Sequence, residues 1–144
     1  MLPGCTLSIK EFNTNQGSTV SKKILIVEDH NDFREIVRNF LRTKMADVNP
    51  EIIEATTGED GVVVALKEKP DIILMDIRLP KMTGMDAASM IKASFPECKI
   101  IILTMFETET FRKVFKSDSV TAYIGKSELY DKLVPEINKI FSKN

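Results

Sequence analysis

Residues 71–76 read Asp-Ile-Ile-Leu-Met-Asp, an almost wholly apolar run that ends in the carboxylate Asp76. Four apolar residues in succession, bounded by acids, are typical of a strand buried in a parallel sheet. In open parallel α/β sheets, ligands bind outside the carboxyl ends of the strands. The sequence therefore predicts that Asp76 meets a ligand at the end of its strand.

Apolar runs on both sides of this strand alternate with amphipathic stretches of helical period. The other strand-like runs are 23–27, 51–55, 99–103 and 121–124. Such alternation is typical of crossover units and a parallel sheet. Five strands and five helices in strict alternation predict an α/β fold, with a five-stranded parallel sheet as the middle layer of a three-layer αβα sandwich.

Capping residues and proline set the limits of the first two predicted helices. We expect Asn31 to cap the first helix, whose apolar residues recur at helical spacing as far as Met45. Residues 57–60 form a capping sequence for the second helix, which Pro70 ends.

Three more helices are predicted after the Asp76 strand. They are expected over about 84–94, over about 107–116, and in a last stretch that ends near Phe141. Pro135 is expected close enough to the first turn of this last helix for its missing N–H to be tolerated there.

Length and composition limit the class of protein. A chain of 144 residues can bury one core, and we expect one ordered domain over 22–144 after a flexible extension over 1–21. A net charge of −1 disfavours direct binding to nucleic acid, and no apolar stretch is long enough to cross a membrane. Cys5 and Cys98 lack metal-ligand spacing and are expected to be reduced thiols in a cytoplasmic protein.

Functional side chains follow four of the five predicted strands. They are Glu28, Asp29, Asp76, Thr104 and Lys126. Because the carboxyl ends of parallel strands lie at one edge of a sheet, we expect these side chains to meet. Three carboxylates repel one another unless a cation joins them, and an all-oxygen ligand set selects a hard ion such as Mg²⁺.

The same cluster can receive a phosphoryl group. Lys126 can pair with a phosphate as a point charge, and Thr104 can donate a hydrogen bond to another phosphate oxygen. With charge neutralised on both sides, a carboxylate oxygen of Asp76 can attack phosphorus and form an acyl phosphate. Each residue alone has an ordinary structural explanation, so the prediction depends on their joint placement.

These motifs together resemble the receiver domain of bacterial two-component response regulators. The resemblance covers the chain from about Lys22 to Phe141 and implies a CheY-like, flavodoxin-like doubly wound (βα)5 fold with strand order 2-1-3-4-5. The matching elements are the acid-pair strand 24–29, the loop of Asp76, Pro80 and Gly84, the hydroxyl of Thr104, the amine of Lys126 and the switch aromatic Tyr123.

The resemblance also implies a ligand set and a partner. Mg²⁺ would be held by Asp29, Asp76 and the backbone carbonyl of Arg78, with Glu28 acting through water. Asp76 would accept its phosphoryl group from a histidine kinase or a histidine phosphotransfer protein. Such a module catalyses only its own phosphorylation and dephosphorylation.

The output implied by the resemblance is a change of surface. Thr104 would move toward the phosphate and Tyr123 would turn inward. The face made by the fourth helix, the fifth strand and the fifth helix would then change for partner binding or homodimerisation.

Three alternatives are weighed against this interpretation. The chain could be the excised receiver half of a helix-turn-helix transcriptional regulator, because residues 27–30 and 103–105 resemble that subfamily. It could be a binding module that works without phosphorylation. A phosphatase of the haloacid dehalogenase type would need a second aspartate where this chain has Arg78.

Residues next to the proposed site require separate interpretation. His30 is interpreted as a polar loop residue rather than a ligand, because an oxygen-lined Mg²⁺ site does not need imidazole. The side chain of Arg78 is expected to be exposed. Met105 and Phe106 follow Thr104 where a small residue is the commoner choice, and our hypothesis is that they hinder access of water to the acyl phosphate.

Overall fold

The computed structural model describes residues 21–106, 109, 113 and 117–142. The predicted extension over 1–21, apart from its last residue, lies outside the described residues, as does most of the helix predicted over 107–116. The strands described are β1 (Lys23–Val27), β2 (Glu51–Ala55), β3 (Ile72–Asp76), β4 (Lys99–Thr104) and β5 (Ala122–Gly125). The helices are α1 (Asn31–Lys44), α2 (Gly58–Glu68), α3 (Gly84–Ser94), the short 3₁₀ helix η1 (Lys126–Glu128) and α5 (Leu129–Ser142).

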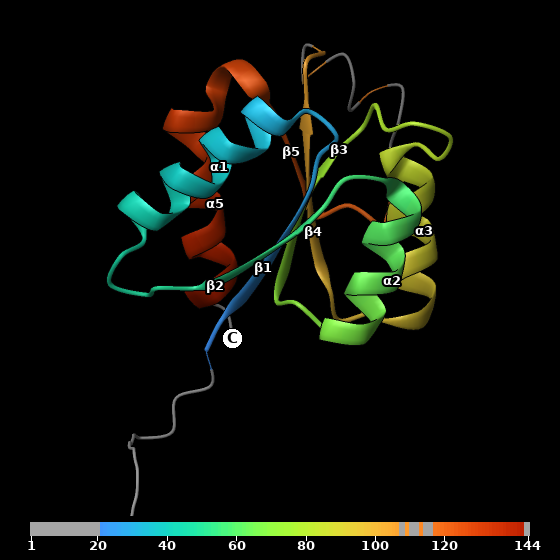
Figure 1. Ribbon diagram of the computed structural model, residues 1–144, viewed down its shortest axis with the longest axis horizontal. Helices are drawn as coiled ribbons and strands as arrows, with labels where there is room; N and C mark the ends of the chain where they lie inside the picture. The colour runs from blue at the N-terminus through green and yellow to red at the C-terminus, as the bar shows by residue number, and fades with distance from the viewer. Residues whose placement is uncertain (1–20, 107–108, 110–112, 114–116, 143–144) are drawn as a thin grey trace, which may run out of the picture.

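The strands form one parallel sheet in the order β2-β1-β3-β4-β5, which confirms the predicted topology. Helices α1 and α5 cover one face of the sheet, and α2 and α3 cover the other (Figure 1). Because successive side chains of a strand point to opposite faces, β3 supplies Ile72 and Leu74 to one core and Ile73 and Met75 to the other. Every residue of β3 is buried, as expected for the central strand of a three-layer sandwich.

Local side-chain chemistry sets two of the helix starts. The Thr57 hydroxyl accepts a hydrogen bond from the backbone N–H of Asp60 at 3.0 Å, which confirms the predicted cap of α2. Thr83 caps α3 in the same way through the N–H of Asp86 at 3.1 Å, a cap the sequence analysis did not identify.

The predicted cap of α1 by Asn31 is wrong. Asn31 is the first residue of the helix, and His30 holds the cap position with extended backbone angles and no side-chain cap hydrogen bond. The Asn31 side-chain oxygen accepts instead from Nη2 of Arg34 at 2.7 Å. The arginine therefore uses the acceptor that was expected to cap the backbone.

The prediction that Pro135 lies close to the first turn of its helix is also wrong. Helix α5 begins at Leu129, so Pro135 is its seventh residue. Leu129 and Leu133 are buried, and this burial favours a helix that begins before the proline, directly after η1. The carbonyl of Asp131 loses its intrahelical donor, but Asp131 is exposed, so water can replace that donor.

No helix in the described part of the chain is both long enough and apolar enough to cross a bilayer.

The turn from β3 into α3 needs a residue without a side chain at Gly84. A Cβ at this position would collide with the backbone carbonyl oxygen of Asp76, and the Gly84 N–H donates to the carbonyl of Ile77 at 3.0 Å. The loop that follows Asp76 therefore folds back tightly onto the strand end.

We expect Gly84→Ala to destabilise the fold by about 1–3 kcal/mol, because backbone must move to admit the methyl group. Urea unfolding followed by circular dichroism measures this change. The matched control is Gly58→Ala, where the added Cβ would meet Cβ, Cγ and the backbone oxygen of Met82 at 3.2–3.3 Å, a tight contact that a shift of a few tenths of an ångström relieves, so its destabilisation should be smaller than that of Gly84→Ala. Equal stability of Gly84→Ala and the unchanged chain would contradict the collision.

Candidate functional site

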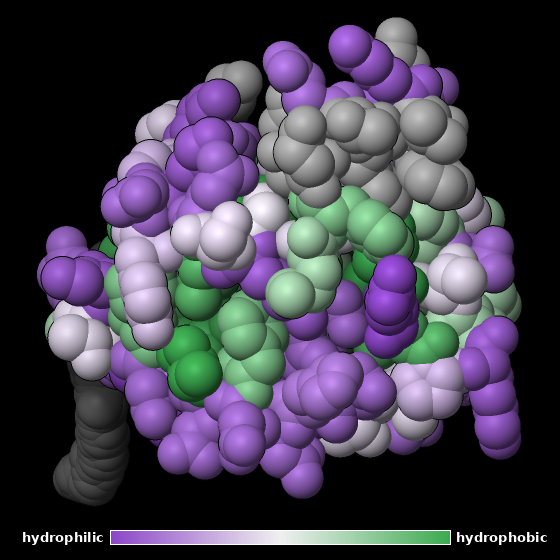
Figure 2. All heavy atoms as spheres, turned by 90° about the horizontal axis from the view of Figure 1, so that it is seen from above, coloured by the Kyte–Doolittle hydropathy of each residue, from purple (hydrophilic) through white to green (hydrophobic). Residues whose placement is uncertain are grey.

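The strand register brings the predicted site residues to one edge of the sheet. Val27 pairs with Met75, so Glu28 follows β1 at the level at which Asp76 ends β3. Thr104 pairs with Gly125, so Lys126 comes one residue beyond the end of β4. Figure 2 looks onto this edge, where hydrophilic and hydrophobic residues are interleaved.

Carboxylates gather at this edge closely enough to share a cation. One ligand atom from each of Glu28, Asp29, His30 and Asp76 can be chosen so that all lie within 4.8 Å of one another. Glu28 and Asp76 are 2% and 4% exposed, so both carboxylates are withdrawn from bulk water. Such a concentration of buried negative charge requires positive charge nearby.

Lys126 supplies part of that positive charge. Its Nζ lies 3.0 Å from Oε1 of Glu28 and 3.4 Å from Oδ1 of Asp76. The ammonium also lies over the ring of Phe33 on α1, 4.4 Å from the ring centroid. The lysine is therefore held between β1, β3 and α1.

The electrostatics of Asp76 are dominated by burial. Desolvation and the neighbouring charge of Glu28 raise the pKa of Asp76 above its ordinary value, although the Lys126 ammonium and a hydrogen bond from the Arg78 backbone act to lower it. The carboxylate form of Asp76 is thus less stable in the folded chain than in water.

Asp29 carries a buried oxygen that no hydrogen-bond donor of the described residues satisfies. Among the described residues, Oδ1 of Asp29 has no hydrogen-bond donor, and Nδ1 of His30 lies 3.4 Å away. A buried carboxylate oxygen without a donor is unusual, and a cation with a preference for oxygen would satisfy it. The acid cluster therefore fits a divalent ion such as Mg²⁺.

Thr104 and Tyr123 lie on the other side of Asp76, on β4 and β5. Thr104 is fully buried, and its Oγ1 accepts from the N–H of Phe106 at 3.0 Å, which leaves the hydroxyl proton available for donation. Tyr123 is half-buried opposite Ile102 in the sheet, and it borders a groove toward α5 that Glu136 and Lys139 also line.

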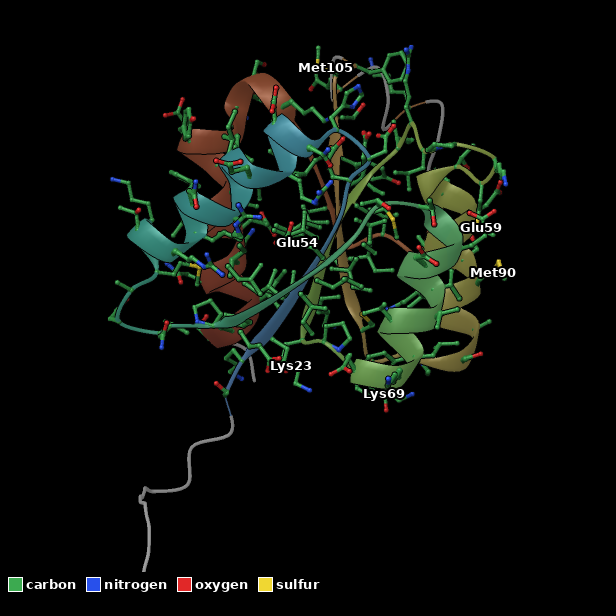
Figure 3. All side chains as sticks on the ribbon, in the orientation of Figure 1. Lys23, Glu54, Glu59, Lys69, Met90 and Met105 are labelled. Atoms are coloured by element: carbon green, nitrogen blue, oxygen red, sulfur yellow. The ribbon has the colours of Figure 1, made fainter. Side chains whose placement is uncertain are left out.

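Three residues beside the site, His30, Arg78 and Met105, can be compared with their predicted environments. The His30 side chain is 73% exposed, yet its Nδ1 lies 3.2 Å from Oε2 of Glu28, so it contacts the acid pair. Arg78 is exposed, as expected, and its guanidinium lies over the Phe106 ring at 4.8 Å. Met105 is 76% exposed and projects at the carboxyl edge of the sheet (Figure 3).

A second group of charged residues beside the site was missed by the sequence analysis. Arg34 and Arg38 on α1 both bind Glu54 on β2, and Figure 3 labels Glu54. The available signal was a glutamate inside a strand together with two arginines one helical turn apart.

Fold and site together define a parallel α/β module with a buried carboxylate at the carboxyl edge of its sheet. The family model of the response regulator receiver domain matches residues 24–138, and the chain belongs to this family. It is a receiver domain of the two-component response regulators, a family whose members are in general not enzymes.

Relatives in both sequence and structure agree with this assignment. The chain is 28% identical to the response regulator GacA of Pseudomonas aeruginosa, over 83% of this chain and 55% of that protein. It is 31% identical to the response regulator VraR of Staphylococcus epidermidis, over 83% of this chain and 56% of that protein. The chain thus spans about half the length of the curated relatives it matches.

Among solved structures, the response regulator TrrA of Thermotoga maritima in complex with Mg²⁺ and BeF superposes with a TM-score of 0.71. It is 28% identical, and the match covers 83% of this chain and 98% of that one. A LuxR-family two-component response regulator from Aurantimonas has a TM-score of 0.73 at 26% identity, covering 87% of this chain and 88% of that chain.

The raised pKa of Asp76 predicts how stability depends on pH. Because the folded-state pKa lies above the unfolded-state value, the fold loses stability as pH rises from the unfolded to the folded pKa. Asn cannot ionise, so without divalent cations Asp76→Asn should be more stable than the unchanged chain at neutral pH, and the difference should shrink toward about pH 3.

Thermal unfolding in EDTA at both pH values measures this difference. Asp47→Asn, at an exposed position after α1, is the control. Lower stability of Asp76→Asn at neutral pH would contradict the unfavourable burial of this charge.

Proposed function

We propose that this receiver domain is a Mg²⁺-dependent phosphoacceptor in which Asp76 is the nucleophile. The observation that carries the proposal is the position of Asp76, buried between the acid pair and the ammonium of Lys126 at 3.4 Å. A carboxylate placed between a cation site and a lysine can receive a phosphoryl group because both sides of the incoming phosphate meet positive charge.

The proposed cation ligands are the carboxylates of Asp29 and Asp76 and the backbone carbonyl of Arg78, with Glu28 acting through water. The Asp29 oxygen that lacks a hydrogen-bond donor supports this set. The bound ion supplies charge neutralisation for the phosphoryl oxygens. In support of the choice of ion, the relative TrrA was crystallised with Mg²⁺.

The proposed chemistry is a phosphoryl transfer from a phosphohistidine. An oxygen of Asp76 forms the new bond to phosphorus, the phosphorus–nitrogen bond breaks, and its electron pair stays on the imidazole of the partner. Lys126 then pairs with the phosphate, and Thr104 donates its hydroxyl proton to a phosphate oxygen. The chain's own catalysis is confined to its phosphorylation and dephosphorylation.

The proposed partners are a histidine kinase or histidine phosphotransfer protein in the cytoplasm. Rearrangement of Thr104 and Tyr123 on phosphorylation would change the face near β5 and α5 for partner binding or homodimerisation. A phosphate adds roughly −1.5 to −2 charges at neutral pH, enough to bias such a two-state element. No direct contact between this domain and nucleic acid is proposed.

Incubation with acetyl phosphate and Mg²⁺ is expected to add one base-labile phosphoryl group, because the site can use a small donor in place of the kinase. Intact-mass spectrometry measures the addition. Asp76→Asn and an excess of EDTA should each abolish it, and Asp47→Asn should leave it unchanged. No mass shift with acetyl phosphate or with a phosphorylated kinase would favour the binding module that works without phosphorylation.

Met105 and Phe106 provide a second prediction about the phosphorylated form. The Phe106 ring lies against the guanidinium of Arg78 beside the site, and Met105 and Phe106 both line a pocket that Tyr123 and residues of α5 also line. If they shield the acyl phosphate from water, replacing both by Ala should raise its rate of hydrolysis severalfold. The decay of the phosphorylated species after removal of donor measures this rate.

Met90→Ala is the matched control for this prediction, because Met90 is exposed on α3. An unchanged decay rate in the Met105→Ala, Phe106→Ala double variant would remove the shielding hypothesis.

A further inference from the structure

One arginine contacts the acid-pair loop from outside the site. Nη1 of Arg34 donates to the backbone carbonyl oxygen of Glu28 at 2.9 Å. Its Nε donates to Oε1 of Glu54 at 2.7 Å, and its Nη2 donates to Asn31 at 2.7 Å. The side chain of Arg34 is only 15% exposed. A single planar guanidinium thus joins β2, the end of β1 and the start of α1.

Glu54 is the acceptor on β2 that anchors the Arg34 guanidinium. Burial alone would raise the pKa of Glu54, but its hydrogen bonds and charge interactions with Arg38 and Arg34 lower that pKa below its ordinary value. Arg38 binds both oxygens of Glu54, at 2.9 and 3.1 Å. When Arg34 is removed, Arg38 therefore still holds both oxygens of Glu54, whereas removal of Arg38 leaves the single hydrogen bond from Arg34.

The hydrogen bond from Arg34 to the Glu28 carbonyl holds the peptide bond that joins Glu28 to Asp29. The Glu28 N–H donates to the carbonyl of Ala55 at 3.0 Å, and the Glu28 carbonyl accepts from Arg34. This carbonyl belongs to the peptide bond between Glu28 and Asp29. Among the described residues, Oδ1 of Asp29 has no hydrogen-bond donor, and its ion-pair contact is with the largely exposed His30 ring at 3.4 Å. The backbone from which this carboxylate projects therefore contributes to its direction.

We propose that Arg34 is a positioning residue for the divalent-cation site. It holds the Glu28–Asp29 peptide against β2 so that the Asp29 carboxylate faces Asp76 before the ion arrives. This inference rests on the proposed function, since it requires the acid cluster to bind a cation. Arg38 shares the anchor Glu54 with Arg34 but has no hydrogen bond or ion pair to the acid-pair loop in the described structure.

Mg²⁺ titration of the full chain by isothermal calorimetry tests the proposal. Loss of an outer-shell partner typically weakens metal binding by 10–100-fold, so we expect Arg34→Ala to raise the Kd for Mg²⁺ about tenfold or more. Arg38→Ala is the matched control, and its Kd should match that of the unchanged chain. Arg34→Lys keeps the charge but cannot span two acceptors as a fork, so it should resemble Arg34→Ala.

Phosphorylation by acetyl phosphate provides a second readout that loss of fold would not reproduce. In Arg34→Ala, the Mg²⁺ concentration for half-maximal rate should rise in proportion to the Kd, and the rate at saturating Mg²⁺ should be retained. Thermal unfolding in EDTA checks that each variant is folded, and Arg34→Lys carries the test if Arg34→Ala is not.

Equal Mg²⁺ affinity in the Arg34 variants and the unchanged chain would overturn the positioning role. So would equal losses in the Arg34 and Arg38 variants, because these would reflect the packing of Glu54 alone. If the unchanged chain binds no Mg²⁺, the proposed metal site falls together with the inference. Binding by the unchanged chain with no difference between Arg34→Ala and Arg38→Ala removes only the inference.

Discussion

The architecture of this receiver domain depends on one ammonium group between two buried carboxylates. Lys126 lies 3.0 Å from Glu28 and 3.4 Å from Asp76, and both acids are almost fully buried. Without a cation between them, two carboxylates at the ends of adjacent strands would repel in surroundings that water hardly screens. The segment after β5 must therefore place the ammonium of Lys126 beside the ends of β3 and β1.

The sheet could be predicted from the sequence because each of its strands is encoded locally. The run 71–76 is apolar on both faces, and the runs beside it differ from helical stretches in both length and period. The site could be predicted because parallel strands end at one edge, so Asp29 and Asp76 must be neighbours there whatever their separation in sequence. These inferences need only strand direction and strand order.

Contacts that depend on side-chain reach could not be predicted in the same way. Asn31 has the chemistry of a helix cap, but Arg34 takes its oxygen, and sequence spacing does not decide between two such donors. Pro135 would favour a helix start nearby, but burial of two leucines on α5 outweighs that local preference. The binding of Arg34 to Glu54 joins α1 to β2, a pairing that becomes visible only when the helix is packed.

The position of Lys126 also constrains how the proposed phosphoacceptor can work. In the described structure the ammonium serves Glu28 and Asp76 together, whereas a phosphoryl group on Asp76 would add oxygens that compete for the same donors. Lysine can turn to the phosphate only if Glu28 and Asp29 receive another positive charge. The proposed divalent cation at the acid pair would supply that charge, and cation binding would then be coupled to release of the lysine. The Asp29 oxygen that lacks a hydrogen-bond donor is the atom at the acid pair that such a cation would satisfy.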